Sequence, residues 1–145
     1  MNAATRLHKV VLIDDNETTN FLNQRLLNRL GVTEEIVVFT DAAAGVKHLW
    51  GADAPRTMPE LVFVDLRMPG LDGVEFLEQY QQQTTPVRER TKLVVLTTSM
   101  MPADRARVAA YAGVDYLVKP LSREKIERLL AEHFPHVPLP APAAS

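Results

Sequence analysis

The amino-acid sequence predicts an α/β domain built around a parallel β-sheet. Short apolar runs recur along the chain, and after each run comes a longer stretch whose apolar residues have helical spacing. The chain has 145 residues, which is about the length of one domain. Its residues are 46% hydrophobic and 23% charged, as in an ordinary globular domain. We therefore expect one core, on which any function has to fit.

The first two runs cover residues 10–13 and 36–39. Between them, residues 15–18 carry side chains that can cap a helix, and Gly31 can end it. The helix is predicted from large apolar side chains with helical spacing, which are Phe21, Leu22, Leu26, Leu27 and Leu30. After the second run, Asp41 is the expected N-cap of the next helix. These stretches form the first two strand and helix pairs.

The next two pairs follow the same pattern. The third run covers residues 61–64, and a turn rich in proline and glycine leads to a helix over residues 74–80. The fourth run covers residues 93–96. Pro102 suits the first turn of the following helix, which we expect to run until Gly113.

The fifth run covers residues 116–118, and Ser122 can cap the final helix. That helix has an apolar face made by Ile126, Leu129, Leu130 and Phe134. We therefore expect a core over residues 9–134, preceded by an N-terminal extension, residues 1–8. Residues 135–145 are rich in proline and alanine and hold little that could be buried, which predicts a flexible tail.

Composition excludes several classes of function. The net charge of -2 is too balanced to favour sequence-independent binding to nucleic acid or to an anionic membrane. With no cysteine, the chain cannot form a disulfide, a thiolate zinc site or a cysteine nucleophile. It has no glycine-rich nucleotide-binding motif and no apolar stretch long enough for a secretory signal or a membrane span. We expect a cytoplasmic protein whose chemistry uses oxygen and nitrogen groups.

Polar side chains follow the runs at the points where the predicted strands end. In chain order they are Asp14, Asp15, Asp65, Thr97 and Lys119. Ligands of open parallel sheets bind at the carboxyl ends of the strands, so these side chains should converge. Taken singly, each of these residues could have a merely structural role, because it could cap a helix, open a turn or lie in solvent. Three close carboxylates, however, repel one another unless a cation lies among them, and such oxygen ligands suit Mg²⁺.

The sequence around these residues resembles a known family. The segments that carry the resemblance are IDD at residues 13–15, DLRMPGLDG at residues 65–73, LT at residues 96–97 and YLVKP at residues 116–120. In this order and at these separations they resemble the receiver domain of two-component response regulators. The resemblance implies a (βα)5 flavodoxin-like, doubly wound sandwich with a five-stranded parallel sheet in the order 2-1-3-4-5 and helices on both faces. It also implies a cis bond between Lys119 and Pro120.

The same resemblance implies roles for the residues at the strand ends. Asp65 would accept a phosphoryl group from the phosphohistidine of a histidine kinase or of a phosphotransfer protein. Asp15 would bind Mg²⁺ directly and Asp14 largely through water, while Asp65 and the backbone carbonyl of Arg67 would complete the protein ligands. Phosphoryl transfer needs positioning and charge neutralisation, which the metal and Lys119 would supply.

The resemblance further implies a switch. Thr97 would donate its hydroxyl to a phosphoryl oxygen and draw its loop inward, and Tyr116 would rotate into the vacated space. The signal would leave through the face made by the helix that begins near Pro102, the fifth strand and the final helix. Thr98 could replace Thr97, but neighbouring strand residues face opposite sides, which favours Thr97. Tyr116 could instead be only a core aromatic.

We therefore expect a stand-alone, Mg²⁺-dependent signalling switch that is not an enzyme and that acts on a downstream protein, not on nucleic acid or membrane. A phosphorylation-dependent homodimer is left open. One alternative is a receiver-like module that binds its partner without phosphorylation, which the acidic cluster and Lys119 disfavour. Another is an aspartate-nucleophile phosphohydrolase of the haloacid dehalogenase kind. That family has a second aspartate two residues after the nucleophile, where this chain has Arg67, a group that could also alter the lifetime of the phosphoryl group.

Overall fold

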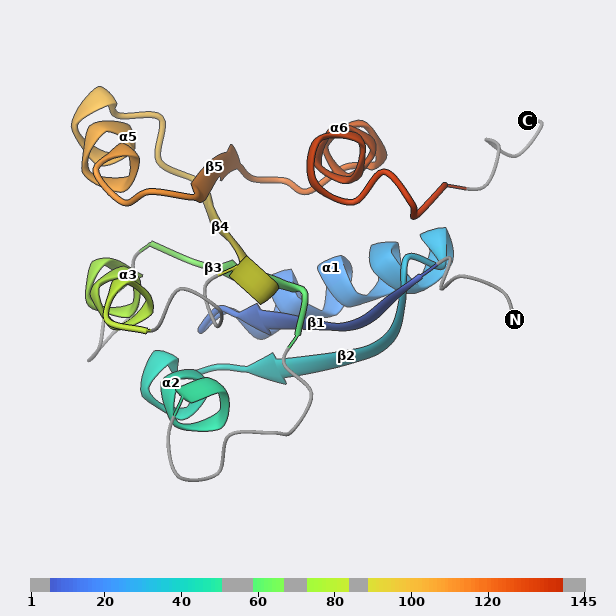
Figure 1. Cartoon of the computed structure of the whole chain (residues 1–145), viewed down its shortest axis with the longest axis horizontal. Helices are drawn as coiled ribbons and strands as arrows, with labels where there is room; N and C mark the ends of the chain where they lie inside the picture. Colours follow the sequence, from blue (N-terminus) through green and yellow to red (C-terminus); the bar gives the residue numbers. More distant parts are fainter. Residues whose placement is uncertain (1–5, 51–58, 67–72, 84–88, 140–145) are drawn as a thin grey trace.

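The computed structural model of the chain describes residues 6–50, 59–66, 73–83 and 89–139. The strands are β1 (Leu7–Ile13), β2 (Thr33–Phe39), β3 (Leu61–Val64), β4 (Lys92–Thr97) and β5 (Val114–Val118). The helices are α1 (Glu17–Leu30), α2 (Ala42–Trp50), α3 (Gly73–Gln81), α5 (Pro102–Ala109) and α6 (Arg123–His133). The strands form one 5-stranded parallel sheet in the order β2-β1-β3-β4-β5 (Figure 1). The predicted fold class and strand order are therefore confirmed.

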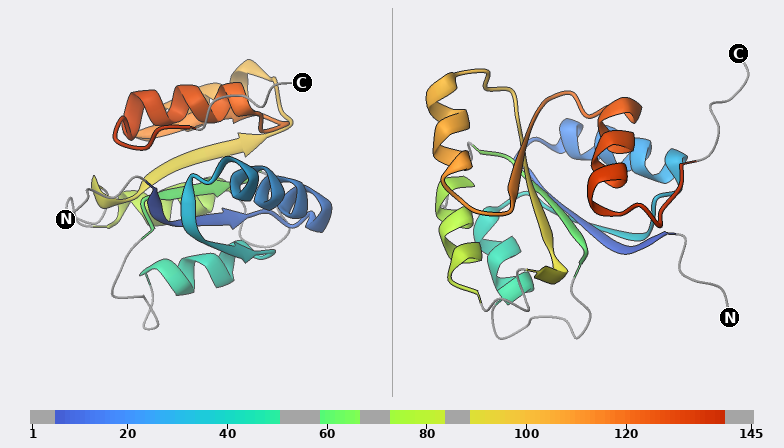
Figure 2. Two further views of the ribbon diagram at one scale, coloured as in Figure 1. Left: turned by 90° about the vertical axis from the view of Figure 1, so that its right-hand side faces the viewer. Right: turned by 45° about the horizontal axis from the view of Figure 1, so that its top comes forward.

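Helices cover both faces of the sheet, as Figure 2 shows. Along β1, Val10 and Leu12 pack with buried residues of α1 and α6, whereas Val11 and Ile13 pack with those of α2, α3 and α5. Successive side chains of a strand point to opposite faces, so a central strand of a two-sided sheet is apolar throughout. This is why the central strands β1, β3 and β4 show continuous apolar runs in the sequence.

Some strands and helices have different limits from those predicted. β1 begins at Leu7, inside the expected N-terminal extension, because Leu7 is buried and pairs with Thr33 at the start of β2. β5 begins at Val114, two residues earlier than predicted, because it pairs with β4 from that point. α5 therefore ends at Ala109, and Gly113 with its φ of +79° lies in the turn that enters β5. Backbone hydrogen bonds between neighbouring strands decide these limits, and such bonds cannot be recognised from the pattern of apolar residues in the sequence.

The helix predicted between the first two strands is present as α1, but only part of its apolar repeat faces the core. Its buried residues are Asn20, Asn23, Leu27 and Leu30. Phe21 is 60% exposed and Leu22 is 55% exposed, so these two apolar side chains lie on the solvent side. Asn20 faces inward, where its side-chain amide donates a hydrogen bond to the backbone carbonyl of Asp14 at 2.8 Å.

The C-terminal segment also differs from its prediction. Val137 is only 4% exposed and packs in the apolar cluster between α1, α6 and the sheet, where the partly buried Leu139 joins it. The expectation that this segment holds little that could be buried is therefore wrong for Val137, while residues 140–145 lie outside the described residues. In the described part of the chain, no helix is long and apolar enough to cross a bilayer.

Candidate functional site

The acidic residues that follow β1 and β3 meet at the carboxyl end of the sheet. Ile13 and Val64 are paired across β1 and β3, and the backbone N–H of Asp65 donates to the carbonyl of Ile13 at 2.9 Å. Asp14 and Asp65 therefore leave the sheet side by side. Each of Asp14, Asp15 and Asp65 offers a carboxylate oxygen that lies within 4.8 Å of the other two. The structure thus brings together the three carboxylates that the sequence singled out.

Lys119 reaches this cluster from the end of β5. Its backbone N–H donates to the carbonyl of Thr97 at 2.7 Å, which places it directly after the last paired residues of β4 and β5. The Lys119 Nζ atom lies 2.5 Å from Asp14 Oδ2 and 3.4 Å from Asp65 Oδ2. The bond between Lys119 and Pro120 is cis, as the resemblance implied.

The cluster combines carboxylates with an ammonium group. Asp14, Asp15 and Asp65 supply three carboxylates, and the ammonium group of Lys119 contacts Asp14 and Asp65. Carboxylate oxygens are hard ligands, and a small dication that keeps several of its waters fits such a set better than a metal that prefers nitrogen or sulfur. The residues present therefore fit Mg²⁺. Arg67, whose backbone carbonyl was expected among the ligands, lies outside the described residues.

Both oxygens of the Asp14 carboxylate already have partners. Asp14 Oδ1 accepts a hydrogen bond from the backbone N–H of Asn16 at 2.9 Å, and Asp14 Oδ2 contacts Lys119. The Asp14 side chain is only 7% exposed, whereas Asp15 is exposed. The two neighbouring aspartates thus have different environments, one fixed and buried, the other accessible to an ion in solvent.

Thr97 ends β4 and is buried, whereas Thr98 is exposed. The Thr97 hydroxyl oxygen accepts a hydrogen bond from the backbone N–H of Ser99 at 3.2 Å. The Ser99 hydroxyl in turn donates to Asp104 Oδ2 at 2.5 Å, at the start of α5. A continuous set of hydrogen bonds therefore joins the strand end to the first turn of α5.

Tyr116 contacts the same loop from β5. Its hydroxyl donates to the backbone carbonyl of Ser99 at 2.7 Å, and the guanidinium of Arg105 lies 4.7 Å from the centre of its ring. Tyr116 is half-buried and packs against the apolar cluster on the α2, α3 and α5 face. It is thus a core aromatic whose hydroxyl also holds the loop after Thr97.

The sequence interpretation did not identify several residues of the site. Ser99, Asp104 and Arg105 connect the strand end to α5, and Asn20 connects Asp14 to α1. The sequence contains no signal for Asn20, because the pattern of apolar residues does not show that its side of α1 turns inward. No signal marks the loop residues either, because serine and aspartate are common wherever a helix begins.

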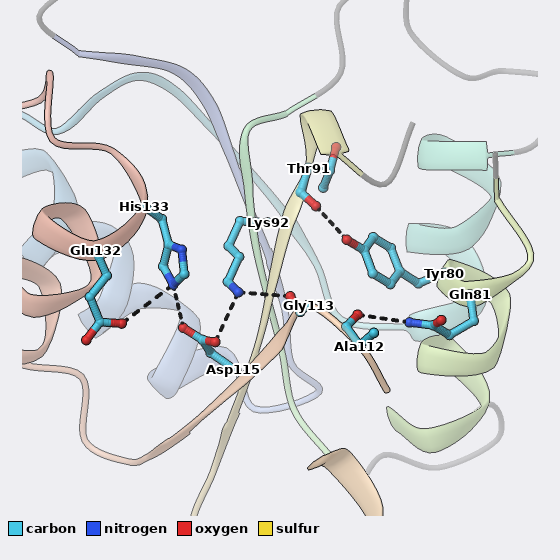
Figure 3. A network of polar contacts seen from close by, with 9 residues as sticks. All are labelled: Tyr80, Gln81, Thr91, Lys92, Ala112, Gly113, Asp115, Glu132 and His133. Atoms are coloured by element: carbon cyan, nitrogen blue, oxygen red, sulfur yellow. Dashed lines mark hydrogen bonds and ion pairs between the residues drawn. The ribbon is translucent and has the colours of Figure 1, made fainter. Parts of the chain in front are cut away.

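A second cluster of ionisable side chains lies at the opposite end of the sheet (Figure 3). There, Asp115 of β5 contacts Lys92 Nζ at 3.0 Å and His133 Nε2 at 2.8 Å. Burial favours the neutral form of Asp115, but the hydrogen bonds from Lys92 and His133 outweigh this effect and lower the pKa of its carboxyl group. Lys92 and His133 thus both contact this carboxylate, and His133 Nε2 also lies 3.6 Å from Glu132 Oε2.

Comparison with known proteins identifies the family. Residues 10–131 match the sequence profile of the response regulator receiver domain. The chain belongs to the response regulator receiver domain family. Among curated receiver-domain relatives, "Probable methanogenesis regulatory protein FilR2" of Methanothrix harundinacea (strain 6Ac) is 35% identical over 85% of this chain and 79% of the relative. A solved two-component response regulator from Cytophaga hutchinsonii is 30% identical, with a TM-score of 0.80 over 90% of this chain and 98% of that one.

Some relatives are much longer than this chain. It spans 49% of the phosphate regulon transcriptional regulatory protein PhoB of Rhizobium meliloti (strain 1021), to which it is 26% identical. Receiver domains are signalling switches that interact with histidine kinases or phosphotransfer proteins, and they generally bind Mg²⁺ at an acidic pocket. Membership of the family and the carboxylate cluster are therefore both consistent with Mg²⁺ binding at the carboxyl end of the sheet.

Proposed function

We propose that Asp65 of this receiver domain accepts a phosphoryl group from the phosphohistidine of a histidine kinase or a phosphotransfer protein. The observation that carries the proposal is the carboxylate cluster with Lys119 at the carboxyl end of the sheet. The Asp65 side chain is 12% exposed, so it keeps some access to solvent beside the ammonium group. Membership of the receiver family supports the same assignment.

In the proposed step, a carboxylate oxygen of Asp65 attacks the phosphorus atom of the donor. A phosphorus–oxygen bond forms while the phosphorus–nitrogen bond to the imidazole breaks, and the leaving nitrogen keeps the electron pair and takes up a proton from solvent. The product is an acyl phosphate on Asp65. Lys119 Nζ, which is 3.4 Å from Asp65 Oδ2, holds positive charge where the phosphoryl oxygens arrive.

Mg²⁺ would be held by Asp14, Asp15 and Asp65, together with the backbone carbonyl of Arg67. When bound, the ion neutralises charge on the carboxylates and on the phosphoryl oxygens. Asp15 is exposed and suits direct contact with the ion. Asp14 suits contact through water, because Asn16 and Lys119 already engage its two oxygens.

The proposed output begins at Thr97. Donating its hydroxyl to a phosphoryl oxygen would draw Thr97 towards Asp65 and disturb its hydrogen bond with Ser99, whose carbonyl holds Tyr116. The movement of the loop after Thr97 would thus reach the face formed by α5, β5 and α6. Met100 and Met101 follow Ser99 and are 80% and 59% exposed, which gives a downstream protein apolar side chains to contact beside the moving loop.

The exposed apolar residues of α1 suit the docking of a phosphoryl donor. Phe21 and Leu22 are exposed in the first half of a helix that begins just after Asp15. A protein donor that brings its histidine to Asp65 has to approach this rim of the sheet. Large exposed apolar side chains on the helix that follows Asp15 favour a contact surface for a protein over one for a small donor.

Intact mass measurement after incubation with acetyl phosphate tests the phosphoacceptor assignment. We expect one phosphoryl adduct that depends on Mg²⁺ and is absent from Asp65→Asn, while the matched control Asp115→Asn is labelled like the wild type. If the wild-type chain formed no adduct, the module that acts without phosphorylation would be favoured. Repeated turnover of unrelated phosphomonoesters would instead favour a phosphohydrolase.

A second arm of this experiment addresses the docking surface. Phe21→Ser should take up phosphoryl groups from acetyl phosphate at the wild-type rate, but more slowly from a phosphorylated histidine phosphotransfer domain. The reason is that a small donor needs no protein contact with α1. Equal slowing with both donors would show that Phe21 affects the reactive site itself and would contradict its role in docking.

A further inference from the structure

The core-facing stripe of α1 has an unusual composition next to the site. Asn20 and Asn23 occupy its first buried positions, while the neighbouring Phe21 and Leu22 point into solvent. Helices of globular proteins normally bury the apolar side chains and expose the amides, because a buried amide without a partner is unfavourable. Departures from such local rules tend to occur at functional sites.

The contacts of Asn20 show what this buried amide does. Its Nδ2 atom donates to the backbone carbonyl of Asp14 at 2.8 Å, across the turn between β1 and α1. Its Oδ1 atom is buried and has no hydrogen-bond partner within the described parts of the chain. Asn20 is only 4% exposed, so this oxygen is held away from solvent at a cost to folding. The burial of this amide at a cost to folding indicates that Asn20 does more than fill space in the core.

The surroundings of Asn20 connect it to the carboxylate cluster. A small cavity of about 10 Å³, roughly the space for one water molecule, is lined by Asn20, Asn23, Asp14 and Asp65, among others. The carbonyl of Asp14 is held by Asn20, and its carboxylate is held by Asn16 and Lys119. Asp14 is thus fixed from its backbone as well as from its side chain.

We propose that Asn20 is a positioning residue of the metal site, which acts by fixing the backbone of Asp14. The inference rests on the proposed function, in which Asp14 holds Mg²⁺ through water. A water-mediated contact depends on the direction of the carboxylate, because the ion and its water leave little freedom in distance or angle. Without the amide of Asn20, the Asp14 carboxylate samples more orientations and binds the hydrated ion less well.

Calorimetric titration of the unphosphorylated protein with Mg²⁺ alone tests this proposal. We expect Asn20→Leu to bind Mg²⁺ about tenfold more weakly than the wild type, as for other residues that orient a metal ligand. The matched control is Asn28→Leu, the same substitution on the same helix at an exposed position that does not line the cavity. Its Mg²⁺ affinity should stay within about twofold of the wild type. Equal weakening by both substitutions, or by neither, would overturn the role of the bond to Asp14.

A kinetic readout separates positioning from a general loss of structure. With acetyl phosphate as donor, Asn20→Leu should raise the Mg²⁺ concentration at half-maximal rate and leave the rate at saturating Mg²⁺ nearly unchanged. A merely structural defect would lower the rate by the same factor at every Mg²⁺ concentration. Asn20→Ala, which removes the amide without adding apolar bulk, provides a second folded variant with the same expected shift. A wild-type chain that neither binds Mg²⁺ nor forms the adduct would contradict the proposed function, and this inference with it.

Discussion

Lys119 connects Asp65, the proposed phosphoacceptor, to the neighbouring Asp14. Its ammonium group contacts both Asp14 and Asp65, and its side chain is only 14% exposed. The contact partly offsets the repulsion between the carboxylates, as an opposite charge at such distances does. After phosphorylation the same ammonium group would face a phosphoryl oxygen. Because Lys119 directly follows β5, a change in this contact would also be felt at the end of β5.

Lys119→Ala should therefore fold and still form the phosphoryl adduct slowly, but it should not transmit the effect of phosphorylation to Ser99 and Tyr116. The reason is that the side chain contacts the carboxylates at the end of the sheet and is not part of the apolar clusters. The measurement is the amide chemical shift of Ser99 and Tyr116 with and without beryllofluoride, a phosphoryl mimic. Large shifts in the wild type and none in the variant are expected, whereas equal shifts in both would rule out this role for Lys119.

The edge formed by β2 and α2 is held to β1 by an uncommon pair. Lys9 is buried on β1, and its Nζ atom lies 3.3 Å from Nε2 of His48 on α2. The His48 ring also contacts Phe39 of β2, with ring centres 5.0 Å apart. Burial lowers the pKa of His48, the charge of Lys9 lowers it further, and Glu35 partly opposes both. The pair is therefore most stable when the imidazole is neutral and accepts from the lysine.

Stability should accordingly fall as the pH falls below about 6.5, the ordinary pKa of histidine. The unfolded chain takes up a proton at His48 before the folded chain does, so the free energy of unfolding decreases until the pH passes the lowered pKa of the folded state. Urea unfolding of the wild type and His48→Gln between pH 5 and pH 8, roughly the range in which histidine titrates, measures this effect. The variant should lose part of the pH dependence, and parallel curves for the two proteins would contradict the assignment.

The two ends of the sheet carry different sets of charged side chains. At the carboxyl end Lys119 contacts Asp14 and Asp65, while at the other end Lys92 and His133 contact Asp115. Between them, the apolar clusters on the two faces keep the sheet rigid, and Val137 closes the cluster between α1 and α6. Val137 is thus part of the core on which the sheet is packed.

Val137→Ala tests whether this segment is docked in solution. The substitution removes two buried methyl groups, so we expect the free energy of unfolding to fall by about 1.5 kcal/mol. Urea unfolding measures this loss, and Pro138→Ala, at a neighbouring exposed residue, is the control that should change little. A stability equal to that of the wild type would mean that Val137 lies in solvent, as a flexible tail requires.

The positions of Asp14, Asp65, Thr97 and Lys119 at one end of the sheet could be predicted from the order of residues along the chain. Each follows the last apolar residue of a central or neighbouring strand, and parallel strands all end at the same edge. The resemblance to receiver domains then supplied the strand order, which the structure confirms. Strand limits were harder to predict, because β1 and β5 begin where a neighbour offers backbone hydrogen bonds.

The orientation of α1 could not be read from the chain alone. Its sequence contains two overlapping stripes, and hydropathy favours the one with Phe21 and Leu22, whereas the folded helix buries Asn20 and Asn23. Tertiary packing makes the difference, since Leu27 and Leu30 on the same face as Asn20 and Asn23 pack in the apolar cluster with β1 and α6. Periodicity within a segment is a local property and specifies helix or strand. The apolar side chains that Leu27 and Leu30 pack against belong to other parts of the chain, so only the assembled fold shows which face of the helix turns inward.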